Sequence, residues 1–229
     1  MLNSCNTIIN MRNTIFAGIY FSLMLFTSCE QTEIVTSSNK KNVILIVTDD
    51  VRYDALQYAQ TDSIRINRFP YVLTPNLDFL ASKSTNFTNA FTVMSICSPS
   101  RASILTGIYP HQHGIVDNYH SFTKSNLGHE FNTAGYATAY FGKWHMGTQR
   151  GSRPGFDRSY SFVGQGEYFD TPFEINGQNT QTKGWVDDLT TNFVIQELNS
   201  INLSNGFFFM IGYKTSHNPW NRSNENVRG

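Results

Sequence analysis

Residues 97–107 of the chain, CSPSRASILTG, combine a cysteine, a helix start and an arginine within five positions. Pro99 suits the first turn of a helix, where its missing N–H costs nothing. Ser98 and Ser100 can cap the free amides of that turn, and the later Ile-Leu pair provides a buried face. We therefore expect Cys97 at the positive end of a helix dipole, where anions are held well. The alternative is a small buried thiol before a capped helix, since free cysteine is usually a core residue.

The same stretch resembles the maturation motif of the type I sulfatases, C-x-P-S-R-x-x-x-L-T-G, with every fixed position present. In that family a formylglycine-generating maturation enzyme oxidises the cysteine to Cα-formylglycine, whose hydrated aldehyde is the working group. The resemblance implies that Cys97 becomes the nucleophile and contacts the metal. It also implies that Arg101 belongs to the catalytic residues and favours the ionised form of the hydrate.

The composition is that of an ordinary globular protein, with 229 residues, 40% of them hydrophobic, and a net charge of +0. This length allows one domain with a sizeable core. The balanced charge argues against a nucleic-acid partner, which would require a basic face. Any selectivity for anions must therefore be local.

The N-terminus has the pattern of a targeting segment. Residues 11–13, MRN, form a short basic region through Arg12, residues 15–26 form a short apolar run, and residues 26–29, FTSC, resemble a bacterial lipobox. We expect a lipoprotein signal peptide over 1–29, with Met11 as a candidate true start and a lipid anchor at Cys29 as the only membrane contact. This predicts export, to the periplasm or to the outer membrane of a bacterium. The alternative is a retained membrane anchor, although the run is short for one.

A polar tether is expected over residues 30–41, followed by the continuous apolar run VILIV at 43–47. Such a run predicts a strand covered on both faces. It leads to Asp49 and Asp50, at the end of a strand where α/β sheets bind ligands. Adjacent carboxylates favour a neutralising cation, and their hard oxygens suit Ca²⁺ or Mg²⁺. A solvated turn is the alternative, and the segment also resembles the first metal-binding element of sulfatases, which implies Ca²⁺ before Mg²⁺.

The rest of the chain alternates between helix and strand patterns. The expected helices cover residues 74–81, 127–134 and 185–198, and the expected strands cover 86–93, 136–141 and 206–213. This alternation predicts an α/β fold with a mostly parallel sheet and helices on both faces. The arrangement is similar to the alkaline-phosphatase superfamily, to which the sulfatases belong.

Residues 142–147, GKWHMG, form a second informative cluster. On an extended backbone Lys143 and His145 point to one face while Trp144 packs on the other. A cation and a proton donor side by side would form an oxyanion-type clamp. A solvated lysine and a hydrogen-bonded histidine are the alternative. The segment resembles the second sulfatase motif, which implies that both side chains stabilise charge on the sulfate and on the hydrate.

Three other segments bear on the site. His111 and His113 lack a third metal ligand nearby and are expected near the mouth of the pocket. Residues 164–169, GQGEYF, are interpreted either as a wall that faces a sugar or as core aromatics. His217 follows the last strand and precedes a proline, and this position resembles the substrate-facing histidine of the family. The resemblance implies that His217 protonates the leaving oxygen.

The resemblance ends at residue 219, and the chain offers fewer oxygens than Ca²⁺ binds. We therefore interpret residues 42–229 as the N-terminal part of a sulfatase catalytic domain, incomplete by itself. The implied function is hydrolysis of a sulfated carbohydrate, and the Gly-Gln-Gly segment favours an amino-sugar 6-O-sulfate. One alternative is a phosphate or phosphonate monoester hydrolase of the same superfamily. The other is an inactive remnant that only binds anionic glycan.

Overall fold

A six-stranded sheet forms the centre of the structure, which is a computed structural model that describes residues 40–60, 69–202 and 205–219. In sheet order the strands are β1 (Val43–Val47), β6 (Phe207–Gly212), β2 (Ala137–Lys143), β3 (Arg158–Phe162), β4 (Phe173–Ile175) and β5 (Gln178–Thr180). The first four are parallel, whereas β4 and β5 continue the sheet antiparallel. The prediction of a mostly parallel sheet is confirmed.

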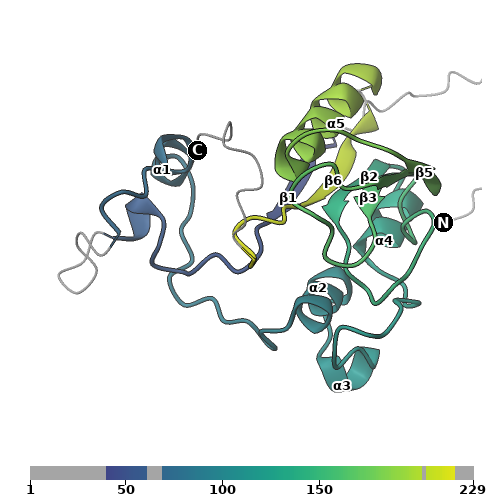
Figure 1. Ribbon diagram of the computed structural model, residues 1–229, viewed down its shortest axis with the longest axis horizontal. Coiled ribbons are helices and arrows are strands. Elements are labelled where there is room, and N and C mark those ends of the chain that lie inside the picture. The colour runs from purple at the N-terminus through teal and green to yellow at the C-terminus, as the bar shows by residue number, and fades with distance from the viewer. Residues whose placement is uncertain (1–39, 61–68, 203–204, 220–229) are drawn as a thin grey trace, which may run out of the picture. The chain divides into compact units, whose positions relative to one another are not determined.

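Helices cover both faces of this sheet (Figure 1). On one face lie α2 (Cys97–Thr106) and α4 (Leu127–Thr133), and on the other lies α5 (Val186–Ser200). Three further short helices complete the described elements: η1 (Gln57–Ala59), α1 (Pro75–Ser82) and α3 (Pro110–His113). Each expected helix begins and ends within two residues of the observed one.

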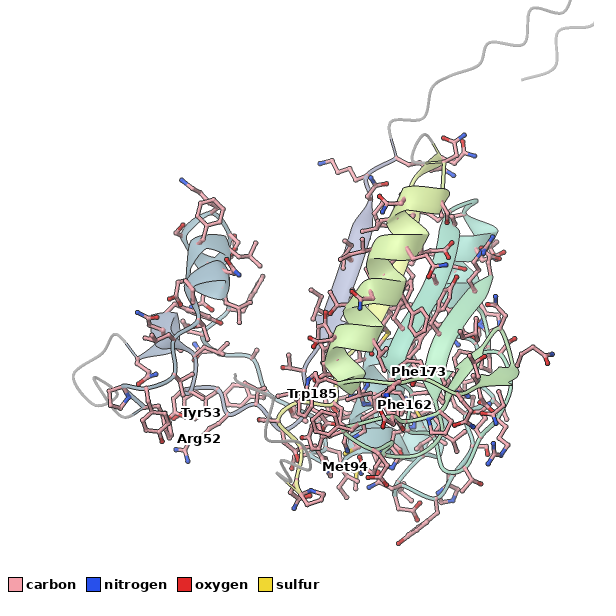
Figure 2. The ribbon with its side chains drawn as sticks, turned by 45° about the horizontal axis from the view of Figure 1, so that its top comes forward. Arg52, Tyr53, Met94, Phe162, Phe173 and Trp185 are labelled. Carbon is pink, nitrogen blue, oxygen red and sulfur yellow. The ribbon has the colours of Figure 1, made fainter. Side chains whose placement is uncertain are left out.

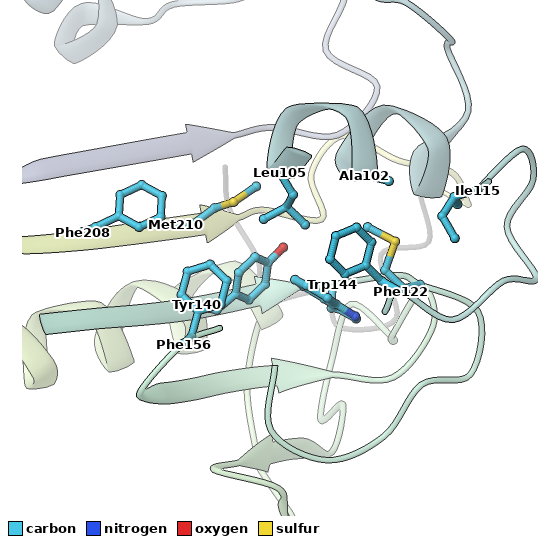
Figure 3. Packing of buried hydrophobic residues seen from close by; sticks show 10 residues of the cluster. Ala102, Leu105, Ile115, Phe122, Tyr140, Trp144, Phe156, Phe208 and Met210 are labelled. Carbon is cyan, nitrogen blue, oxygen red and sulfur yellow. The ribbon is translucent and has the colours of Figure 1, made fainter. Parts of the chain in front are cut away.

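The alternation of side chains along β6 divides the core into two layers. Phe208 and Met210 pack with Leu105 of α2, in the cluster seen in Figure 3. Phe207 and Phe209 point to the other face, in the cluster that includes Val194 of α5. Each large apolar side chain buried in this way contributes about 1.5–3 kcal/mol. A continuous apolar run is thus required wherever a strand has helices on both sides.

A third cluster extends the core beyond the start of α5. It contains Phe162 at the end of β3, Phe173 of β4 and the partly buried Trp185 (Figure 2). Trp185 stacks on Tyr168, with ring centroids 4.7 Å apart. This cluster positions the loop that follows β3 beside the carboxyl ends of the central strands.

The expectation that β1 is covered on both faces is wrong. Ile44 and Ile46 are 47% and 54% exposed, whereas Val43, Leu45 and Val47 pack against the core. The reason is that α5 lies over β2 and β3, so it does not reach the edge strand β1.

The strand expected over residues 86–93 is also absent, because this segment has no partner strand in the described part of the chain. Its aromatic side chains Phe87 and Phe91 are 79% and 87% exposed. Conversely, the short strands β3, β4 and β5 were not predicted. Period-two alternation alone therefore does not identify a strand, since pairing requires a neighbour.

The predicted signal peptide lies outside the described residues, as does almost all of the tether. Within the described ranges no helix is long and apolar enough to cross a membrane.

Candidate active site

The carboxyl ends of three neighbouring strands meet at the site. Asp49 and Asp50 follow β1, Lys143 ends β2, and the loop that holds His217 follows β6. Because β6 lies between β1 and β2, these ends lie along one edge of the sheet. The sequence motifs that are far apart along the chain therefore converge in space.

Helix α2 brings the cysteine to this edge. Cys97 is its first residue, as predicted, but the expected capping by Ser98 and Ser100 is wrong. The Ser98 hydroxyl instead donates to the backbone carbonyl of His145. The Ser98 amide donates to Oδ1 of Asn118 at 3.0 Å, so a residue from a distant loop satisfies the first turn. These two bonds fix the start of α2 against the loop after β2.

Asp49 is the centre of the charge network, with 6% of its surface exposed. Its Oδ2 accepts a hydrogen bond from Nζ of Lys143 and lies 3.5 Å from Nη2 of Arg101. Its Oδ1 lies 3.8 Å from Sγ of Cys97, and the Lys143 ammonium is also 3.8 Å from that sulfur. Four residues predicted for the site are thus brought together by the fold.

Arg101 reaches this network because the backbones at Lys143 and Gly212 lie close together. Its Nη1 donates to the carbonyl of Lys143 at 2.6 Å, and the Tyr140 hydroxyl donates to the same carbonyl at 2.5 Å. A Cβ added at Gly212 would lie 2.5 Å from that carbonyl oxygen and 2.6 Å from Nη1. Glycine is therefore required at the end of β6 for the guanidinium to reach its place.

Asp50 and His217 form a second, more exposed pair. Nε2 of the histidine lies 3.8 Å from Oδ2 of the carboxylate, with side chains 15% and 58% exposed. Asp50 has a φ of 52°, in the left-handed region that few residues other than glycine adopt. The two loops are joined by backbone hydrogen bonds, from the Asp49 amide to Thr215 at 3.2 Å and from the Ser216 amide to Asp49 at 2.7 Å.

The surroundings shift the pKa values of Asp49 and Cys97 in opposite directions. Burial alone would raise the pKa of Asp49, but Lys143 and Arg101 together hold it below the ordinary value. Burial raises the pKa of the Cys97 thiol, and the nearby Lys143 opposes this only in part. The encoded cysteine is therefore held as a thiol, unlike the low-pKa cysteines that act directly as nucleophiles.

His145 is buried, with 6% of its surface exposed, and burial, Lys143 and Arg101 lower its pKa to about 4. The ring is therefore neutral at pH 7, and its Nδ1 has no hydrogen-bond partner among the described residues. Its φ of 50° interrupts the extended backbone on which the alternation of residues 143–145 was argued. Trp144 nevertheless packs in the core as expected.

Sequence reasoning missed Lys214 and Asp187 at the site, and it included Gln165 in the segment 164–169 without assigning these contacts. The side-chain oxygen of Gln165 accepts from Nζ of Lys143, and its backbone oxygen accepts from Nζ of Lys214 at 3.1 Å. Asp187, in the first turn of α5, accepts from the amides of Lys214 and Thr215 at 2.8 and 2.9 Å. The glycines beside Gln165 were the only signal available, because these partners lie far apart in the sequence.

The two histidines expected at the pocket mouth have other positions. His113 ends α3 and is buried, with Nε2 3.0 Å from the Ser103 hydroxyl and Nδ1 accepting from the Ile115 amide. It therefore connects α3 to α2, while His111 is exposed. The core interpretation of the aromatic stretch is confirmed for Tyr168, which also lines a cavity, while the sugar-facing interpretation stays a prediction.

The donor chemistry for a metal is present only in part. Asp49 and Asp50 offer hard carboxylate oxygens, and Asp49 is held ionised by two cations. Among the described residues no group of three or more histidine, cysteine, aspartate or glutamate side chains could hold a metal ion. The pair fits a hard divalent cation in kind and supplies only part of its coordination shell.

Comparison with known proteins identifies similar chains. The Sulfatase family model matches residues 41–228. An N-acetylglucosamine-6-O-sulfatase of Bacteroides thetaiotaomicron is 31% identical over 188 residues, which cover 80% of this chain and 32% of that protein. An ulvan-active sulfatase of Formosa agariphila is 38% identical over 155 residues, covering 64% of this chain and 29% of the relative.

A solved structure, of a protein in complex with its substrate D-glucosamine-2-N,6-O-disulfate, matches with a TM-score of 0.70. The sequence identity is 31%, and the match covers 79% of this chain and 35% of the other. The chain thus spans about a third of the length of each of these three proteins.

Proposed function

The chain belongs to the sulfatase family, and on that premise we propose that it serves the hydrolysis of a sulfate ester on a glycan, with residue 97 as the reacting position. The observation that supports this most is the placement of Cys97 at the start of α2, 3.8 Å from both Asp49 and Lys143. A sulfate group that approaches residue 97 would meet fixed positive charge without solvent having to reorganise.

The proposed nucleophile is made from the encoded cysteine. Oxidation of Cys97 to formylglycine by a maturation enzyme would supply a hydrated aldehyde whose hydroxyl attacks sulfur. Burial raises the pKa of the encoded thiol, which disfavours direct attack by a thiolate, so the proposal assigns the nucleophile to the modified residue. Arg101 stabilises negative charge at this position, because its guanidinium is buried and already oriented by the Lys143 carbonyl.

The remaining side chains act on the sulfate and the leaving group. Lys143 provides a buried cation, and neutral His145 provides one ring N–H for a hydrogen bond to developing charge. His217 is the proposed acid that protonates the leaving alcohol oxygen, since it lines the cavity beside the site. Its Nε2 lies 3.8 Å from Oδ2 of Asp50, so the ring is held beside the proposed metal ligands.

Asp49 and Asp50 are the proposed ligands of a divalent cation, Ca²⁺ before Mg²⁺, together with residue 97 after modification. When bound, the ion supplies Lewis-acid stabilisation of negative oxygen at the reacting position. The chain's own contribution is a buried carboxylate kept ionised by two cations and a second carboxylate open to solvent.

The proposed substrate is a sulfated carbohydrate, and within that class an amino-sugar 6-O-sulfate. Support comes from the relative named as an N-acetylglucosamine-6-O-sulfatase and from the structural neighbour bound to a sulfated glucosamine. We also propose export as a lipoprotein anchored at Cys29, from the lipobox-like segment at residues 26–29. Export would bring the protein to glycans outside the cell.

Parallel assays on matched esters test this function. The chain is co-expressed with a formylglycine-generating enzyme and incubated with Ca²⁺ and either 4-nitrophenyl sulfate or 4-nitrophenyl phosphate. We expect sulfate release that Cys97→Ala abolishes. Faster release of phosphate would favour the alternative of a phosphate or phosphonate ester hydrolase. Binding of glucosamine 6-O-sulfate without release of either anion would favour the alternative of a remnant that only binds glycan.

A further inference from the structure

A cavity of about 440 Å³ lies beside the reacting position, and its size suits one sugar residue. Its lining includes Gln165, Tyr168, Lys214 and His217. Gln165 also accepts a hydrogen bond from Lys143, and His217 also faces Asp50. The cavity is therefore continuous with the catalytic residues.

Lys214 is the buried cation of this cavity, with 2% of its surface exposed. Its ammonium donates to the backbone oxygen of Gln165 at 3.1 Å and lies 4.7 Å from the centre of the Tyr168 ring. An ammonium has three N–H donors, so this partner leaves capacity for others. Within the described ranges no carboxylate lies within ion-pair distance of Lys214, although the exposed Glu167 also lines the cavity.

A lysine in this position opposes folding unless an anion joins it. Removing an ammonium from water costs several kcal/mol, and buried charges are normally paired. One carbonyl and one aromatic face compensate only in part, and burial, followed by the charge of Lys143, lowers the pKa of Lys214. Its backbone is nevertheless held in place by Asp187 of α5, so the cation is presented to the cavity.

The two lysines are arranged about a single residue. Lys143 binds the side-chain oxygen of Gln165, and Lys214 binds its backbone oxygen. Their separation is therefore limited to the span of one glutamine and two hydrogen bonds. A sugar with two anionic groups, or two adjoining sugars with one each, can present one group to each lysine. Asp49 already pairs with Lys143, whereas no carboxylate of the described residues lies within ion-pair distance of Lys214.

We propose that Lys214 is a specificity-determining residue that binds a second anionic group of the substrate, a sulfate or a carboxylate, next to the sulfate that faces residue 97. The proposal rests on the proposed function, since it assumes a sulfated sugar in the cavity. In this proposal Lys214 determines which substrate binds more tightly, and the residues around position 97 carry out the reaction.

Calorimetric titration in Ca²⁺ buffer at physiological ionic strength tests the proposal. The ligands are glucosamine 6-O-sulfate, glucosamine-2-N,6-O-disulfate, and a disaccharide in which a uronic acid adjoins glucosamine 6-O-sulfate. We expect the chain to bind one of the last two at least about tenfold tighter than the first. The ligand that gains identifies the second anion as a sulfate or a carboxylate.

Three variants complete the design. Lys214→Met should abolish the preference, Lys214→Arg should retain most of it, and the exposed Lys183→Met is the matched control that should leave it unchanged. Lys214→Met should unfold thermally at the same or a higher temperature than the wild type, because it removes a buried charge.

Equal affinity of the wild-type chain for all three ligands, no binding of any, or a preference that survives Lys214→Met would overturn the proposal. Hydrolysis measured in parallel separates the two claims. Release of sulfate without a Lys214-dependent preference would leave the proposed function intact, and a Lys214-dependent preference without release would leave the anion site intact.

Discussion

Replacement of Asp49 by asparagine removes a carboxylate that is paired with two buried cations, Lys143 and Arg101. Asp49 and Arg101 are 6% and 3% exposed, Lys143 is fully buried, and Asp49 lies 3.5 Å from the Arg101 guanidinium. At an effective dielectric constant of about 20, unit charges at that distance attract by about 5 kcal/mol. Desolvation offsets part of this attraction, but removal of one partner leaves the cations unpaired. We expect Asp49→Asn to lower the free energy of unfolding by about 3–5 kcal/mol.

Urea unfolding in metal-free buffer at pH 7 measures this loss. The neighbouring Asp50→Asn is the matched control, because that side chain is 58% exposed and its loss should stay within about 0.5 kcal/mol. The double variant Asp49→Asn/Lys143→Met should recover much of the stability, since it also removes a cation. Equal losses for Asp49→Asn and Asp50→Asn, or a double variant less stable than Asp49→Asn, would refute the reasoning.

The pH dependence of the free energy of unfolding is a second test of the role of Asp49. Lys143 and Arg101 hold the pKa of Asp49 below 3.8, its ordinary value, in spite of burial. The unfolded chain therefore binds this proton first as the pH falls. The stability that Asp49 contributes is present above pH 3.8 and is lost as the pH falls through the lower folded pKa. The difference between wild type and Asp49→Asn should shrink over that range.

Three other predictions concern residues that support the site: His145, Asp187 and Gly142. Burial lowers the pKa of His145 from an ordinary 6.5 to about 4, so its NMR titration should have a midpoint near 4. The free energy of unfolding should also fall as the pH drops from 6.5 towards 4, because the unfolded chain binds this proton first. A midpoint near 6.5 would contradict the burial argument. Asp187→Ala should lower the free energy of unfolding, measured in urea, by about 1–3 kcal/mol, because it removes the acceptor of two backbone amides. The control Asp188→Ala, at the adjacent exposed position, should have little effect. Equal losses for the two variants would contradict this prediction. Gly142→Ala should lower the thermal unfolding temperature more than Gly151→Ala. Both glycines have a positive φ, but only at Gly142 would an added Cβ meet the backbone, 2.2 Å from an oxygen. Equal decreases would show that the positive φ alone sets the loss of stability.

The features that the sequence predicted well are those with a local signature. The apolar run of β6 and the amphipathic α5 were placed within two residues, because burial on a strand or helix face imposes a short period. The start of α2 at Cys97 followed from the proline in the first turn. The strand predicted at residues 86–93 was wrong because alternation was present but none of the strands that the structure describes pairs with this segment.

The contacts that build the site could not be derived in this way. Asp49 and Lys143 are 94 residues apart, and Lys143 and Cys97 are 46 apart, so the strand order and the packing of α2 on the sheet bring them together. Gln165 and Lys214 belong to no periodic pattern, because their role depends on one hydrogen bond across the sheet edge. Motif resemblance named the residues proposed to react, whereas the residues that contact them could be identified only from the structure.

Mass spectrometry of the peptide that contains residue 97 tests most directly whether this position is the reacting group. After co-expression with a formylglycine-generating enzyme, we predict that the cysteine sulfur is replaced by an aldehyde oxygen, which an aldehyde-specific hydrazide probe would label. Peptides of the same preparation that lack residue 97 should stay unlabelled. A thiol retained at residue 97 in all of the protein would contradict the proposed nucleophile.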